Sequence, residues 1–504
     1  MNLANRQERT AAGALVLGVA RIFSKSFDLI TLIVLTHCLL PQDFGLVALA
    51  ITFVQIVEMV FDVPLVNVLL RLETVERRHL DTLFTLGLLR GVALSAVMCL
   101  LSIPIAHFYG DARLIGLICA LSLAPALRGL RSPRQVELAR DMRFAPEAWS
   151  EAIGKAVALI TASTLAITSG SYWAIASATI TGPAVTTIAT YCFVPYRPGL
   201  TLRDWELFRG FLGWGMAGQT VNAMNGQCDR VVLGKFLSHT HLGFFSTARD
   251  LASGVVIALV NTISWPVISA LTAVNEDRER LTRAYGLVTC AIMAIGLPIV
   301  CGQALVADEL VPLALGNRWH SAVPMFQAIS ISIIPVLYTT TTNALFYAVG
   351  RPNLIFTRNF YDFLFRVPAT VLFAMLYGWV GAVGAMIAAE VLLWAICSTA
   401  VRGLLGVSVS RQLLNLWRPA VACLCMAFSI GALRLAIVEA GAAPSAFEFL
   451  LQAVPLAAGT YFGALLLAWH WSGRPDGLET LVAEFLQRRL ARDPVPAMSP
   501  EGLL

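Results

Sequence analysis

A short polar turn, Leu40-Pro41-Gln42-Asp43-Phe44-Gly45, separates two long apolar runs near the start of the chain. The first run covers residues 13–38, and the second covers residues 44–70. A helix needs about 20 apolar residues to cross a bilayer, and each run is long enough. The pattern therefore predicts two transmembrane helices that are joined by a tight connection.

Composition extends this interpretation to all 504 residues. Apolar residues make up 57% of the chain and charged residues only 13%, whereas charged residues make up about 25% of a soluble domain. No soluble fold has enough interior for this much apolar surface. Composition excludes a cytosolic enzyme, a secreted disulfide scaffold and a disordered protein. It predicts an all-α polytopic membrane protein.

We expect fourteen spans. Their approximate ranges are 13–38, 44–70, 82–107, 113–132, 148–168, 172–194, 210–234, 243–271, 284–305, 321–349, 354–376, 379–401, 414–438 and 446–471. Between spans, 25 Lys and Arg residues lie at the termini or in even-numbered connections, and four lie in odd-numbered ones. Because positive residues favour the cytoplasmic side, both termini are expected in the cytoplasm.

The turn before Gly45 has a counterpart about 200 residues later, where Leu242-Gly243-Phe244 opens another span. Gly170-Ser171-Tyr172-Trp173 and Gly378-Trp379-Val380 form a second such pair. Two six-span halves imply lobes related by an axis along the membrane normal, which is typical of an alternating-access carrier. The predicted parts are a cytoplasmic N-terminus (1–12), an N-lobe (13–194), a cytoplasmic linker (195–209), a C-lobe (210–401), two extra helices (402–471) and a cytoplasmic tail (472–504).

The first predicted span carries three ionisable residues, which are costly at bilayer depth and usually functional or paired. Arg21, Lys25 and Asp28 are spaced by four and three residues, so they share one helix face. Two cations that repel each other fit a face that meets an anion. The alternative is a structural stripe in which Asp28 neutralises Lys25.

Two further spans carry polar stripes. Glu58 and Asp62 lie four residues apart and are candidates for holding a proton or a cation, or for pairing with the basic face of the first span. The seventh span places polar residues at helical spacing, which favours either the wall of a hydrated cavity or hydrogen bonds between helices. These residues are Gln219, Asn222, Asn225 and Asp229.

Some charges fit a structural role. Asp362 and Arg366, four residues apart, predict an ion pair within a span, and Lys155 with Glu151 predicts another. Glu390 is isolated in the sequence. The remaining cations form a candidate cavity for an anionic head group, because Arg presents a fork suited to phosphate. The candidate cavity contains Arg21, Lys25, Arg230 and Arg249.

Several chemistries are not expected. The ten cysteines lie mostly inside apolar runs, where they are typical of small core residues and not of disulfides or metal ligands. No GxxxxGK motif is present, so the chain does not hydrolyse ATP by itself. We therefore expect no catalytic residue, no metal and no cofactor.

Short motifs recur along the chain in a characteristic order. They are Leu40 to Leu46, Asp62 followed by an apolar run to Leu70, Asp229-Arg230-Val231-Val232-Leu233-Gly234, Leu242 to Ala248, Gly316-Asn317-Arg318-Trp319, and Ala344 to Pro352. Over about residues 10–400 this order resembles Wzx-type polysaccharide flippases of the multidrug/oligosaccharidyl-lipid/polysaccharide exporter superfamily. The resemblance implies two six-span lobes plus two extra spans.

The resemblance also implies a function. Such proteins flip undecaprenyl-pyrophosphate-linked oligosaccharides across the bacterial inner membrane for exopolysaccharide, capsule or lipopolysaccharide synthesis. Coupling to a proton or sodium gradient is implied, with Asp28, Glu58, Asp62 and Asp229 as candidates. The implied partners are the lipid-linked substrate, membrane lipids, and the polysaccharide polymerase and export machinery; no nucleic acid is expected.

Other functions remain open. A lipid II flippase of the same superfamily differs in substrate only. A multidrug/cation antiporter predicts an acidic cavity, which the basic face of the first span opposes. A membrane polymerase or ligase usually needs a large periplasmic loop, which the sequence lacks, and a scaffold does not explain the intramembrane charges.

Overall fold

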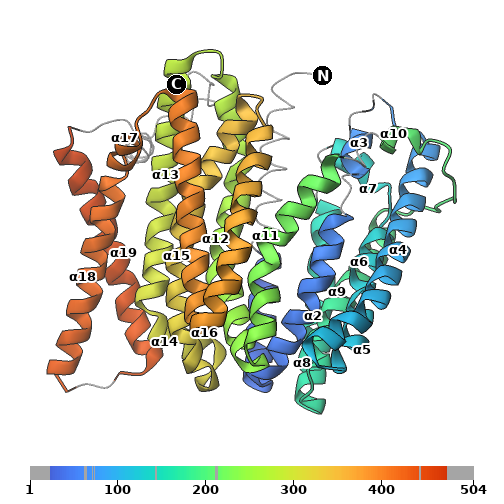
Figure 1. Cartoon of the computed structure of the whole chain (residues 1–504), viewed down its shortest axis with the longest axis horizontal. Coiled ribbons are helices and arrows are strands. Elements are labelled where there is room, and N and C mark those ends of the chain that lie inside the picture. The colour runs from blue at the N-terminus through green and yellow to red at the C-terminus, as the bar shows by residue number, and fades with distance from the viewer. Residues whose placement is uncertain are drawn as a thin grey trace, which may run out of the picture. The chain divides into compact units, whose positions relative to one another are not determined.

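A computed structural model describes residues 23–61, 65–70, 72, 74–141, 143, 145–209, 214–441 and 444–473. Every regular element within these ranges is helical (Figure 1). Arg21 and Asp62 lie outside the described residues, as does the side chain of Gln219. The structure therefore locates the side chains of the other candidate site residues only.

The chain forms two compact units. Unit 1 comprises Met1–Thr247 and Val367–Ala382, and unit 2 comprises Ala248–Arg366 and Val383–Leu504. The border between the units lies within α12, whereas the sequence predicts a linker between lobes at 195–209. The six-plus-six lobes stay a prediction.

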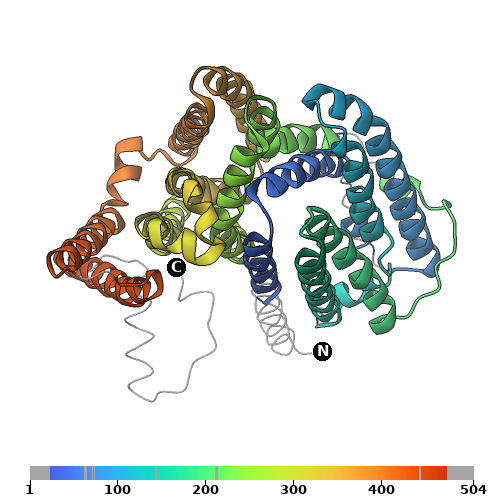
Figure 2. The ribbon, with the colours of Figure 1, turned by 90° about the horizontal axis from the view of Figure 1, so that it is seen from below.

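The described helices of unit 1 begin with one over residues 23–38. The others are α2 (Pro41–Val60), α3 (Leu65–Leu70), α4 (Arg77–Tyr109), α5 (Arg113–Leu121), α6 (Leu123–Gly129), α7 (Gln135–Arg140), α8 (Ala145–Ser169), α9 (Trp173–Phe193), α10 (Glu206–Arg209), α11 (Trp214–Phe236), the start of α12 (His239–Ala273) and Val367–Ala382 within α16 (Asn353–Leu405). Within this unit α8 and α9 lie side by side (Figure 2).

Unit 2 holds the rest of α12 and most of α16. Its elements are α13 (Arg278–Leu305), α14 (Ala307–Leu315), the 3₁₀ helix η1 (Asn317–Ala322), α15 (Val323–Ala348), α16 (Asn353–Leu405), α17 (Val409–Leu414), α18 (Trp417–Glu439) and α19 (Ala446–Trp471). Asp277 caps α13 by accepting hydrogen bonds from the backbone N–H groups of Glu279 and Arg280.

Eight described stretches are long and apolar enough to cross a membrane. They are α2, α4, α8, α13, Asn317–Ala348, α16, α18 and α19. The multi-pass membrane fold is thus confirmed, while the count of fourteen spans stays a prediction.

Two breaks follow local backbone chemistry. The 53-residue α16 is interrupted at Gly378, whose φ of 61° is readily adopted only by glycine; the sequence predicts two spans that meet there. The predicted span 113–132 consists of α5 and α6, which meet at Ser122. Because Pro125 has no N–H, it cannot bond the carbonyl of Leu121, and the helix is interrupted at that point.

The opening turn and its repeat counterpart pack against each other within unit 1. A Cβ added to Gly45 would lie 1.8 Å from the carbonyl oxygen of His239, and one added to Gly243 would lie 1.8 Å from that of Pro41. Pro41 and His239 are 198 positions apart, as are Gly45 and Gly243. The contact is therefore reciprocal, which is what a two-fold axis between repeats produces, and it requires glycine at both positions.

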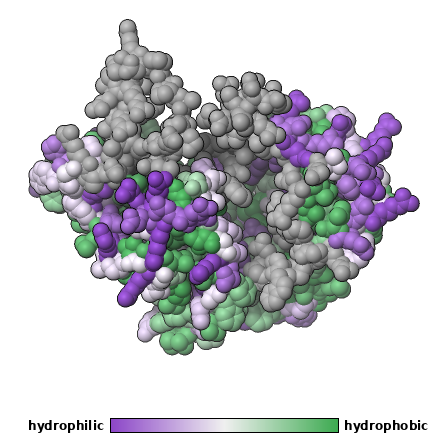
Figure 3. Space-filling view, turned by 90° about the horizontal axis from the view of Figure 1, so that it is seen from above, coloured by the Kyte–Doolittle hydropathy of each residue, from purple (hydrophilic) through white to green (hydrophobic). Residues whose placement is uncertain are grey.

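Large apolar side chains face outward along the long helices. On α18, Phe428 is 80% exposed and Leu424 is 70% exposed. Figure 3 looks onto one end of the helices and shows hydrophilic residues gathered in patches, with hydrophobic residues between them and along the lower edge of the view. This distribution fits helices whose flanks contact lipid and whose ends contact water.

Candidate substrate-binding site

Lys25, Asp28 and Lys155 form a group in unit 1 that we call the lysine cluster. Lys25 Nζ lies 3.5 Å from Asp28 Oδ2, and Lys155 Nζ donates a hydrogen bond to Asp28 Oδ1. Lys25 and Asp28 come from the helix over residues 23–38, and Lys155 comes from α8. Two ammonium groups share one carboxylate, so the three side chains carry one net positive charge.

The lysine cluster is accessible. The side chains of Lys25, Asp28 and Lys155 are 55%, 38% and 33% exposed. The same two helices are also joined by Ser24, whose hydroxyl donates to Glu151 Oε1 at 3.3 Å. A fixed pair of helices with exposed ammonium groups is a suitable place for an anionic ligand.

The predicted pairing of Lys155 with Glu151 is wrong, because Lys155 contacts Asp28 on another helix. Lys155 was thus missed as a member of the candidate site. It is one of only three lysines in the chain, and its position inside a predicted span was the available signal. A contact between helices cannot be read from spacing along one helix.

The carboxylate of Glu58 pairs with Arg128, a partner that the sequence analysis does not predict. Its carboxylate accepts hydrogen bonds from Nε and Nη2 of Arg128, the shortest at 2.6 Å. Arg90 Nη2 also donates to the backbone oxygen of Glu58 at 3.5 Å. The pair joins α2 to α6, and Glu58 is therefore engaged in a bidentate ion pair.

The polar stripe on α11 is largely packed. Asp229 is 1% exposed and accepts a hydrogen bond from the hydroxyl of Thr370 at 3.5 Å. Asn225 and Arg230 are both 8% exposed, whereas Asn222 is exposed. Burial of this kind is typical of a packed interface between helices, so the role of these residues as a hydrated wall stays a prediction.

The same helix carries a polar contact that the sequence did not reveal. Gln227 Nε2 donates to Gln55 Oε1 at 2.9 Å, which links α11 to α2.

Arg249, the last candidate cation, lies half-buried on α12 in unit 2. The predicted cations therefore fall into two units, with Lys25 and Arg230 in the first.

Unit 2 holds a buried group that we call the arginine triad: Asp362, Arg366 and Glu390. Arg366 Nε donates to both carboxylate oxygens of Asp362, at 3.1 and 3.2 Å, and its Nη2 donates to Glu390 Oε1 at 2.7 Å. The predicted Asp362–Arg366 ion pair is confirmed. Glu390, isolated in the sequence, joins it, and the three side chains carry one net negative charge.

Comparison with known proteins decides the family. A profile described as "Polysaccharide biosynthesis protein" matches residues 34–324, more than half of the chain. The chain belongs to this family. The lipopolysaccharide biosynthesis protein WzxC of Escherichia coli K12 is 22% identical over 422 residues, which cover 82% of this chain and 85% of WzxC.

Other similar proteins agree with this family. The succinoglycan biosynthesis transport protein ExoT of Rhizobium meliloti is 25% identical over 309 residues, which cover 60% of this chain and 62% of ExoT. The teichuronic acid biosynthesis protein TuaB of Bacillus subtilis is 22% identical over 307 residues, which cover 59% of this chain and 63% of TuaB. The Wzx-type assignment is confirmed.

Solved structures show the fold. The lipid II flippase MurJ in an inward closed conformation matches with a TM-score of 0.71 at 13% identity, over 91% of this chain and 99% of MurJ. An inward-facing multidrug resistance MATE family transporter matches with a TM-score of 0.60 at 14% identity, over 78% of this chain and 99% of the transporter. The chain is thus a membrane protein of the polysaccharide biosynthesis family, and it shares its fold with these two structures.

Proposed function

We propose that this transporter flips an undecaprenyl-pyrophosphate-linked oligosaccharide across the bacterial inner membrane by alternating access. The proposal is supported by the family and by the similarity to the lipopolysaccharide biosynthesis protein WzxC and the succinoglycan transport protein ExoT. The lysine cluster is the observation that carries it. Two exposed ammonium groups around one carboxylate leave positive charge for a head group to neutralise.

The geometry of the cluster suits exchange of partners. At 3.5 Å, Lys25 and Asp28 form a long contact between exposed side chains, and such pairs contribute at most about 1 kcal/mol. A pyrophosphate offers several charged oxygens at once, so it competes well for both lysines. The sugars extend from this point into polar surroundings, while the prenyl tail stays in lipid.

Coupling to a proton or sodium gradient is part of the proposal. Of the candidate carboxylates, Asp28 contacts both lysines of the cluster, whereas Glu58 is held by Arg128 and Asp229 is buried beside Thr370. Asp28 is therefore the favoured coupling residue because it shares cations with the substrate. Flipping that survives a proton uncoupler but stops with a sodium ionophore would assign the ion as sodium.

The cellular setting follows from the same proposal. Both termini lie in the cytoplasm, and the lobes at 13–194 and 210–401 open in turn to the two faces of the membrane. The flipped unit is then passed to a polysaccharide polymerase and to export machinery. Exopolysaccharide, capsule and lipopolysaccharide pathways all supply substrates of this chemistry.

A lipid II flippase is the second candidate, because MurJ shares the fold over 91% of this chain. Lipid II also carries a pyrophosphate, so the lysine cluster fits either substrate. A drug/cation antiporter is disfavoured, since the accessible cluster carries a net positive charge.

The test begins with deletion of the gene in its bacterium. Lipid-linked oligosaccharides are then followed in spheroplasts with an impermeant sugar-modifying probe. Loss of surface polysaccharide with an accumulated, unreachable lipid-linked unit is the expected result. A lipid-linked unit that accumulates but is reachable by the probe would show that the protein acts after flipping, as a polymerase or ligase does. Loss of peptidoglycan would indicate that the transported substrate is lipid II.

A further inference from the structure

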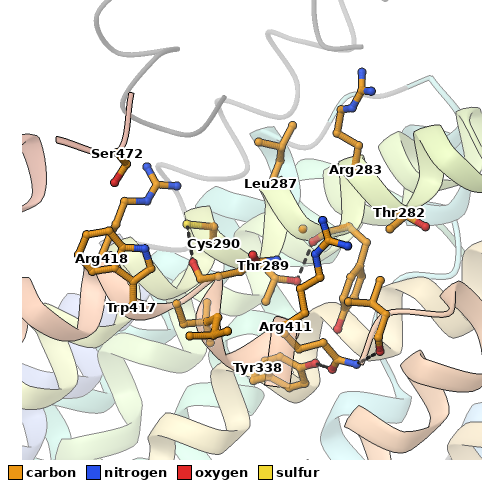
Figure 4. A pocket seen from close by; sticks show the side chains of 17 residues that line it. Thr282, Arg283, Leu287, Thr289, Cys290, Tyr338, Arg411, Trp417, Arg418 and Ser472 are labelled. Atoms are coloured by element: carbon orange, nitrogen blue, oxygen red, sulfur yellow. Dashed lines mark hydrogen bonds between the residues drawn. The ribbon is translucent and has the colours of Figure 1, made fainter. Parts of the chain in front are cut away.

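Unit 2 contains a pocket of its own, with a volume of about 490 Å³. It is formed by the first turns of α13, by Tyr338 of α15, by the segment from Val407 to Arg418, and by Ser472 after α19 (Figure 4). Arg283, Arg411 and Arg418 all line it. None of its lining residues within the described chain is a carboxylate, so the pocket is cationic.

The guanidinium groups of Arg283 and Arg411 are available to a ligand. Arg283 and Arg411 are exposed, and neither has an ion pair with any residue that the structure describes. Arg418 is 8% exposed and extends the positive charge into the wall. The two exposed guanidinium groups suit a ligand with several anionic oxygens, because each can donate two parallel hydrogen bonds.

The deep part of the pocket is polar and already hydrogen-bonded. The hydroxyl of Tyr338 donates to Gln412 Oε1, and Gln412 Nε2 donates to the backbone oxygens of Ser398, at 3.1 Å, and Val407, at 2.9 Å. Ser408 caps α17 by accepting from the N–H of Arg411. These bonds fix the backbone that carries Arg411, so the pocket is preformed.

One rim of the pocket is apolar. Leu414 on α17 and Trp417 at the start of α18 line the pocket and are 65% and 44% exposed, and Leu413, which precedes Leu414 on α17, is 49% exposed. Tryptophan beside exposed leucines is typical of the boundary between head groups and acyl chains. A ligand held here by the arginines would place an attached apolar tail against these side chains.

We propose that this pocket binds the phosphate of an anionic lipid head group from the surrounding leaflet. The arginines meet the phosphate oxygens, and Leu414 and Trp417 contact the acyl chains. The site holds a membrane lipid and is distinct in its residues from the lysine cluster. It therefore goes beyond the proposed flipping function, and binding is measured without flipping.

The first test removes charge. The purified full-length protein and a double variant, Arg283→Ala with Arg411→Ala, are placed in detergent with added phosphatidylglycerol, and bound lipid is counted by native mass spectrometry. The matched control is Arg351→Ala with Arg402→Ala, two exposed arginines of the same unit that do not line the pocket. We expect the pocket variant to lose at least half of the retained lipid and the control to lose none.

The second test fills the pocket while every arginine stays. Gly286 lines the pocket, and a Cβ added there meets nothing within 4 Å. Gly286→Phe is expected to exclude the lipid. Gly302→Phe is the control, because Gly302 lies on the same helix, has the same open space and does not line the pocket.

Thermal unfolding gives a second readout, since a ligand that binds only the folded state raises Tm. Phosphatidylglycerol is expected to raise the Tm of the wild type and of both controls by several degrees, with little shift for the pocket variants. Equal lipid retention by Gly286→Phe and by the wild type would overturn the proposal. An equal Tm shift from inorganic phosphate alone would also overturn it, because the site would then bind a soluble anion.

Discussion

The lysine cluster of unit 1 and the arginine triad of unit 2 are built from the same kinds of residue in opposite proportions. The first combines two cations with one carboxylate at 33–55% side-chain exposure, and the second combines one cation with two carboxylates at 5–14%. Ionisable residues within a membrane protein thus serve two purposes. Exposure with excess positive charge suits ligand binding, whereas burial with several hydrogen bonds to one cation suits structure.

The largest stability effect is expected in the triad. Arg366→Ala removes the cation from two buried carboxylates, and breaking a buried ion pair from one side costs about 3–5 kcal/mol. Thermal unfolding in detergent checks this value. Arg402→Ala, an exposed arginine at the end of the same helix, is the control and should change stability little.

The lysine cluster should behave in the opposite way. Lys25→Ala with Lys155→Ala removes exposed charges, so the loss of stability should not exceed about 1 kcal/mol, while polysaccharide export is lost. Surface polysaccharide of the complemented deletion strain measures this. The third lysine supplies the control: Lys235 contacts the backbone and ring of Phe108 instead, and Lys235→Ala should export normally.

The shared carboxylate allows a finer test. Asp28→Asn frees both lysines, so the cluster gains one positive charge and should bind a pyrophosphate-headed lipid severalfold more tightly, with a stronger dependence on salt. Binding of a fluorescent prenyl pyrophosphate to the purified variant measures the change. Weaker binding by Asp28→Asn would show that the carboxylate positions the lysines and that their excess charge is not what binds.

The smallest effect is expected at Asp111, a half-buried residue that lies between α4 and α5. Hydrogen bonds from Arg113, with a smaller contribution from His239, hold the pKa of Asp111 below its usual range. A depressed pKa contributes stability above the unfolded value of about 4, which is lost as pH falls through the folded value. Thermal unfolding should show a slightly weaker loss on acidification for Asp111→Asn than for the wild type.

The fold was predictable because it depends on local chemistry. Apolar runs gave the membrane class, Gly378 gave the break in α16, and the spacing of Asp362 and Arg366 gave their pair. The repeat seen at Gly45 and Gly243 reappears as a reciprocal contact between helix starts. Apart from this contact between helix starts, each of these features lies within one helix or at one turn.

The site was less predictable because its contacts join helices that are distant in sequence. Lys155 reaches Asp28 across 127 positions, and Arg128 reaches Glu58 across 70. Spacing along one helix predicted an ion pair of Lys155 with Glu151. It placed Glu58 beside Asp62 as a proton or cation site, or opposite the basic face of the first span, and indicated neither Asp28 nor Arg128 as a partner. One sequence gives no information on which faces of distant helices meet.

Flipping by purified protein tests the central claim most directly. The wild type, Lys25→Ala with Lys155→Ala, and Lys235→Ala are reconstituted into liposomes that contain a pyrophosphate-linked oligosaccharide, and an impermeant sugar-modifying enzyme reports the outer leaflet. Rapid exposure of the inner-leaflet pool by the wild type and Lys235→Ala, with none by the double variant, is expected. Equal flipping by all three proteins would contradict a role for the lysine cluster. Absence of flipping by every one of them would contradict the proposal that a pyrophosphate-linked oligosaccharide is the substrate.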